Sequence, residues 1–147
     1  MGGRIIANIR QFELGEVIRF RLDIVFLQIG TNDLAKRGMS PLTVGSAIED
    51  FVRLFHDEYG VRLICVGQTI PRHLAGNFNA NVRLLAQCLK TVLEPFPFPI
   101  YWTYRGFWRA STSYLSYDGV HLLREGQHKL FKSIREAVMQ CLNRLMT

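Results

Sequence analysis

The segment DIVFLQIGTNDL, residues 23–34, restricts the possible fold more than any other part of this 147-residue chain. Its first half is an almost unbroken run of large apolar side chains: Ile24, Val25, Phe26, Leu27 and Ile29. Runs of this kind are typical of parallel strands that helices cover on both faces, whereas strands with one wet face alternate apolar and polar residues. The chain then turns polar at Gly-Thr-Asn-Asp. We therefore expect a buried strand over residues 23–30 with polar side chains at its carboxyl end.

The rest of the chain alternates between apolar runs and amphipathic stretches. VRLICVG over 61–67 and IYWTYRGF over 100–107 have the composition of two further strands. Helices are expected between Ser40, which can cap the amino end, and Gly60, and also over about 79–93 and 124–146. The first twenty residues predict a short helix or an irregular lead-in. This alternation predicts a single α/β domain, residues 1–147, with a parallel sheet.

Composition excludes several classes of function. The chain has 48% hydrophobic residues and no apolar run near the roughly 18 residues of a membrane span. We find no signal peptide and expect a cytoplasmic location by default. The formal charge is +6, but the basic residues are scattered, so nucleic-acid binding is not expected. Cys65, Cys88 and Cys141 lack metal-ligand spacing and form no disulfide framework, so we expect buried free thiols.

Asn32 and Asp33 follow the first strand directly. Ligands of open parallel sheets bind beyond the carboxyl ends of the strands. The Asn32 amide could therefore donate a hydrogen bond to a developing oxyanion. The alternative is a turn in which these side chains only close the strand.

A second candidate pair is Asp118 and His121, three residues apart just before the last helix. At this spacing a carboxylate can hold the imidazole Nδ1–H and leave Nε2 as a general base. The alternative is a turn or cap role for Asp118 and a surface role for His121. His128 lies within the expected helix and is interpreted as solvated, whereas His73 lies in a loop that could line a cleft.

The two motifs, taken in order and spacing, resemble those of the SGNH (GDSL-type) hydrolase family. Gly30, Asn32 and Asp33 match its third sequence block, and Asp118 and His121 match its fifth. The stretches DGVHLLREGQHKL and FNANVRLL are also similar to the family, so the resemblance covers nearly the whole chain. It implies a three-layer, flavodoxin-like α/β fold whose reaction uses no metal and no cofactor.

The resemblance also implies functional roles. His121 is the base, Asp118 orients it, Asn32 and Gly3 form the oxyanion hole, and Asp33 and Gly30 support the site. The family nucleophile is a Ser in Gly-Asp-Ser, which these 147 residues do not contain. The family pattern places that Ser before residue 1, so we expect a domain without its first two strands.

Two functional interpretations follow. The first is a domain that hydrolyses carboxylic esters of small molecules but is inactive as this isolated chain. The second is a catalytically dead binding or protein-interaction module that keeps the hydrolase cleft. In both, the strand at 23–30 would lack one partner and could mediate self-association through an exposed sheet edge.

Overall fold

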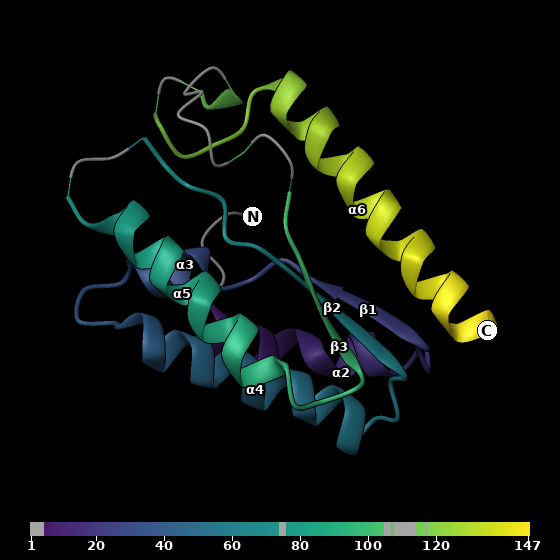
Figure 1. Ribbon diagram of the computed structural model, residues 1–147. Coiled ribbons are helices and arrows are strands. Elements are labelled where there is room, and N and C mark those ends of the chain that lie inside the picture. The colour runs from purple at the N-terminus through teal and green to yellow at the C-terminus, as the bar shows by residue number, and fades with distance from the viewer. Residues whose placement is uncertain (1–4, 74–75, 105–106, 108–113, 117) are drawn as a thin grey trace.

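The computed structural model describes residues 5–73, 76–104, 107, 114–116 and 118–147. A three-stranded parallel sheet forms its centre, in the order β1 (Ile24–Leu27), β2 (Leu63–Gly67) and β3 (Pro99–Trp102) (Figure 1). The expected α/β architecture is therefore confirmed. Within the described residues β1 pairs only with β2, so its other side is a sheet edge.

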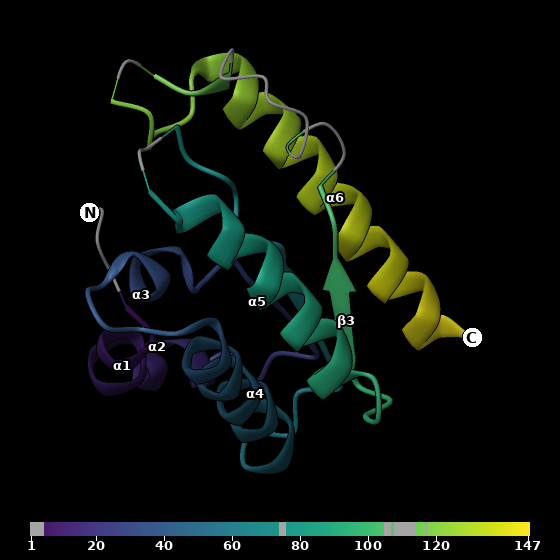
Figure 2. The same ribbon diagram turned by 60° about the vertical axis from the view of Figure 1, so that its left-hand side comes forward.

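Helices cover both faces of the sheet and give three layers (Figures 1 and 2). α4 (Pro41–Asp57) and α5 (Phe78–Leu93) lie on one face, where Val25, Leu27, Ile64 and Val66 point into the larger core. α6 (Arg124–Met146) lies on the other face. There Ala137 and Cys141 pack on Leu63 and Cys65, with Ile24 and Phe26 at the margin.

Local signals fix the ends of α4 as expected. The Ser40 hydroxyl accepts a hydrogen bond from the Thr43 N–H at 3.1 Å, and Pro41 occupies the first helical position. Gly60 adopts φ +66° and donates its N–H to the His56 carbonyl at 3.1 Å, which closes the helix.

The amino-terminal segment is helical but irregular. It comprises α1 (Ile6–Asn8), the π-helical stretch η1 (Ile9–Glu13) and α2 (Leu14–Ile18). Ile6 and Leu14 are buried in the larger core, so this segment joins the layer of α4 and α5.

β3 is shorter than the sequence indicated, because it ends at Trp102 and not at 107. Beyond Trp102, a hydrogen bond to a side chain takes the place of the backbone hydrogen bonds between β2 and β3. The Tyr104 N–H donates to Gln68 Oε1 at 2.6 Å, and the Tyr104 side chain is fully buried. β1 likewise ends at Leu27, short of the expected residue 30.

The free cysteines follow the expectation in part. Cys65 and Cys141 are buried, whereas Cys88 is half-buried. In the described ranges, no helix combines the length and the apolar character that crossing a membrane requires.

Candidate active site

A short helix, α3 (Thr31–Ala35), follows β1 and carries Asn32 at its second position. The preceding Gly30 adopts φ +101°, a conformation that residues with a Cβ rarely adopt. Its carbonyl accepts the Leu34 N–H at 2.8 Å and starts the helix. A Cβ at Gly30 would also lie 3.1 Å from Ile48 Cδ1 in the core. Gly30 therefore turns the chain tightly where β1 ends and places Asn32 at the carboxyl end of the sheet.

Asp33 braces this turn from inside. Its side chain is buried, and both carboxylate oxygens accept the Ile6 N–H at 3.2 Å. Burial raises the pKa of this carboxyl, and the hydrogen bond from Ile6 opposes that rise. The carboxylate thus ties the amino-terminal segment to the residue next to Asn32.

The two oxygens of Asp118 have separate partners. Oδ1 accepts hydrogen bonds from the Ser116 hydroxyl at 2.6 Å and from the N–H groups of Val120 and His121, each at 2.9 Å. Oδ2 contacts Nδ1 of His121. The hydrogen bond from Ser116, followed by those from His121, holds the pKa of this carboxyl far below its usual range. Asp118 therefore stabilises the turn and holds the imidazole at the same time.

His121 is presented to solvent by this arrangement, with its side chain 73% exposed. An ionised carboxylate can only accept hydrogen bonds, so the proton of a neutral His121 ring belongs on Nδ1. Nε2 then carries the lone pair that a general base needs.

The other histidines differ in their surroundings. His128 is exposed on α6, as expected. His73 is also exposed, and its backbone N–H donates to the Gly119 carbonyl at 2.8 Å. This bond fastens the loop after β2 to the turn that carries Asp118 and His121.

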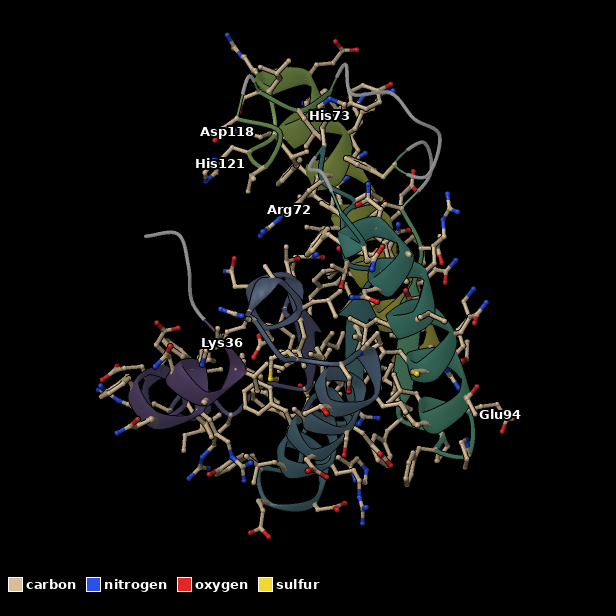
Figure 3. The ribbon with its side chains drawn as sticks, turned by 90° about the vertical axis from the view of Figure 1, so that its left-hand side faces the viewer. Lys36, Arg72, His73, Glu94, Asp118 and His121 are labelled. Atoms are coloured by element: carbon tan, nitrogen blue, oxygen red, sulfur yellow. The ribbon has the colours of Figure 1, made fainter. Side chains whose placement is uncertain are left out.

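Arg72 connects the two halves of the site. Its Nη2 donates to Oδ1 of Asn32 at 3.1 Å, and it lies close enough to Asp118 for their charges to interact. Arg72, Asp118 and His121 project to the same side of the molecule (Figure 3). The sequence analysis missed Arg72, although its place in the loop after β2 is a signal that points to this rim.

A buried polar cluster supports the strand ends and was also missed. The Tyr104 hydroxyl donates to Gln28 Oε1, and Gln28 Nε2 donates to the Gln68 carbonyl at 3.0 Å. Gly67 lies directly against these groups, and a Cβ there would collide with Tyr104 and Gln28. The cluster fixes the carboxyl ends of all three strands relative to one another.

Gly3, which the resemblance assigns to the oxyanion hole, lies outside the described residues, as does Ser113. Ser116 is described, and its hydroxyl donates to Asp118 and not to His121. Within the described ranges, no cluster of three or more His, Cys, Asp or Glu side chains could hold a metal ion.

Three solved structures are similar to this chain. The first is an acetyl esterase, a mutant with acetate ion (TM-score 0.81, 16% identity, 97% of this chain and 70% of that chain covered). The second is a carbohydrate esterase of family 3 from Talaromyces cellulolyticus (TM-score 0.80, 16% identity, 97% and 70%). The third is a putative acylhydrolase from Bacteroides fragilis (TM-score 0.73, 19% identity, 96% and 73%). No protein-family model and no curated protein sequence matches the chain.

These similarities define the class of fold. The chain shares the three-layer α/β architecture of these esterase and acylhydrolase structures over nearly its whole length.

Proposed function

We propose that this chain is an SGNH-type ester hydrolase domain with a flavodoxin-like fold, and that its site acts on small carboxylic esters such as O-acetyl groups or acyl lipids. The observation that carries the proposal is the linked pair of contacts Asp118–His121 and Arg72–Asn32 at the carboxyl ends of the strands. The esterase and acylhydrolase neighbours support the same class of reaction.

In the proposed reaction, His121 Nε2 removes a proton from the attacking hydroxyl as its oxygen adds to the ester carbonyl, and Asp118 stabilises the imidazolium that forms. The imidazolium then returns the proton to the alkoxide that leaves when the ester C–O bond breaks. The Asn32 amide and the N–H of Gly3 donate to the oxyanion.

The nucleophile is the missing part, since these 147 residues contain no Gly-Asp-Ser. Ser116 does not replace it, because its proton is directed to Asp118. We therefore propose that the isolated chain is an inefficient esterase. In serine proteases that have lost a member of the triad, the oxyanion hole and substrate binding alone leave roughly 10³–10⁴-fold acceleration over water. Incubation with a fluorophosphonate probe should give no stoichiometric labelling of any Ser.

The test is hydrolysis of 4-nitrophenyl acetate by the purified chain and by three variants. Asn32→Ala should remove most of the residual rate, because the oxyanion donor supplies it. His121→Ala should lower the rate only by the part in which Nε2 acts as a general base toward water. His128→Ala is the matched control, because it removes an exposed imidazole from the same end of the domain, and it should leave the rate unchanged. Equal rates for the wild type, His121→Ala and Asn32→Ala would refute the proposed site.

A second candidate function is that of a binding or protein-interaction module that keeps the hydrolase cleft. The edge of β1 that pairs with no strand in the described residues favours it, together with Phe20 and Leu22, which lie just before that strand and are 74% and 36% exposed. An edge strand with apolar neighbours is a template for pairing with a further strand. This candidate predicts binding without any hydrolysis that depends on His121.

A further inference from the structure

Arg72 is held in place more firmly than a surface arginine. Its backbone N–H donates to Asn79 Oδ1 at 2.9 Å, and its carbonyl accepts from Asn79 Nδ2 at 2.7 Å. The guanidinium lies over the Phe78 ring, 4.9 Å from its centroid. Both partners belong to the start of α5, so this helix fixes where the Arg72 side chain can reach.

The position of Arg72 has a cost. Its Nε is buried with no hydrogen-bond partner in the part of the chain that the structure describes. Burial lowers the pKa of the guanidinium, and the nearby charge of Asp118 opposes this effect. A side chain that served only to fill space could be apolar and avoid the desolvation of a charged group.

Building on the proposed function, we propose that Arg72 is a positioning residue that sets the orientation of the Asn32 amide in the oxyanion hole. A guanidinium carries five N–H donors and no acceptor. The atom that faces it must therefore be Oδ1 of Asn32, as the 3.1 Å bond from Nη2 shows. This orientation directs the Nδ2 donor end of the amide away from Arg72.

The orientation matters because an asparagine amide is nearly symmetric in shape. Rotated by half a turn, it would present Oδ1 in place of Nδ2, and an oxygen would repel a developing oxyanion. Arg72 excludes the rotated state, since guanidinium N–H groups would then face amide N–H groups. The positive charge also polarises the amide and strengthens Nδ2 as a donor.

The same side chain relates the amide to the base. A hydrogen bond joins Arg72 to Asn32, and the charge of Asp118 favours the protonated guanidinium. Arg72 is thus linked to the oxyanion donor by a direct contact and to the Asp118–His121 pair by electrostatic attraction.

The test is a double-mutant cycle on the affinity for sodium acetate, whose carboxylate stands in for the oxyanion. Acetate is titrated into ¹⁵N-labelled wild type, Arg72→Gln, Asn32→Ala and the double variant, and binding is followed at the His121 ring. Gln is informative because it can accept as well as donate, so it permits the rotated amide. Arg72→Lys retains a charged group with donors only, and Arg83→Gln removes an exposed charge from α5 as the control.

Arg72→Gln should weaken acetate binding about tenfold, the scale of one charge-assisted hydrogen bond. In the Asn32→Ala background the same change should have less than about a twofold effect, because a positioning residue acts through its partner. The acetate affinity of Arg72→Lys should stay within about threefold of the wild-type value. The affinity of Arg83→Gln should equal the wild-type value.

Several outcomes would overturn the inference. If Arg72→Gln lowers the acetate affinity equally in the wild-type and Asn32→Ala backgrounds, Arg72 binds acetate directly. If it lowers the affinity in neither background, Arg72 has no role in binding. If Arg72→Gln does not fold, the acetate titration of the wild type still tests the inference. Acetate should then shift the NMR signals of the Asn32 side-chain amide. A shift of the Arg72 N–H signals without one at Asn32 would refute the inference. An absent response at His121 in the wild type would refute the proposed function, and this inference with it.

Discussion

Substitution of Gly30 by Ala tests whether the turn that presents Asn32 depends on both backbone conformation and close packing. At φ +101° an Ala residue is strained, at a cost of about 1–2 kcal/mol. Its Cβ would also lie 3.1 Å from Cδ1 of Ile48, a side chain with no exposed surface. Crowding a packed core in this way costs about 1–2 kcal/mol more. We expect Gly30→Ala to destabilise the domain by about 2–4 kcal/mol, a large part of a total of about 5–15 kcal/mol.

Urea and thermal unfolding of four variants separate the two contributions. Gly38→Ala is the matched control, because Gly38 has φ +81° but open space around its Cβ position, so only the strain of about 1–2 kcal/mol applies. Ile48→Val deletes Cδ1, the atom that the new methyl group meets, and costs about 0.5–1.5 kcal/mol alone. The double variant Gly30→Ala/Ile48→Val should therefore lose less stability than the sum of the single changes. Equal effects of Gly30→Ala and Gly38→Ala, with full additivity in the double variant, would refute the packing argument.

Two further predictions concern the sheet edge and the Asp118 carboxyl. We expect the chain to self-associate through the open edge of β1, and a monodisperse monomer in analytical ultracentrifugation would contradict this. The hydrogen bonds to Asp118 depress its pKa below the ordinary value of 3.8, so their contribution to stability is complete above about pH 4 and is lost only as the pH falls through the lowered pKa. Ser116→Ala should raise this pKa in a ¹³C NMR titration of the carboxyl carbon, and an unchanged value would show that Ser116 does not stabilise the ionised form.

Features that depend on neighbouring residues could be predicted from the sequence. The apolar runs gave all three strands, and the Ser40 cap and Gly60 marked the ends of α4. The contact between Asp118 and His121 belongs to the same class, since a turn of three residues brings the two side chains together.

Features that depend on distant partners could not be predicted. β3 ends early because Tyr104 bonds to the Gln68 side chain, 36 residues away in the sequence. Arg72 is identified as part of the candidate site by its hydrogen bond to Asn32, which is 40 residues away in the sequence. No local sequence pattern identifies such a pair. The short helix α3 was missed for a different reason, because the sequence Gly-Thr-Asn-Asp has the composition of a simple turn. The role of Gly3 stays a prediction, since it lies outside the described residues.

The central claim is that Asp118 presents His121 as a general base, and the tautomer of the His121 ring tests it most directly. Long-range ¹H–¹⁵N NMR correlations at a pH where the ring is neutral distinguish a protonated Nδ1 from a protonated Nε2. Because the ionised Asp118 can only accept a hydrogen bond, we predict that the proton resides on Nδ1, leaving Nε2 with a lone pair. Asp118→Asn should abolish this preference. A wild-type ring protonated on Nε2, or a mixture of tautomers that Asp118→Asn leaves unchanged, would contradict the account.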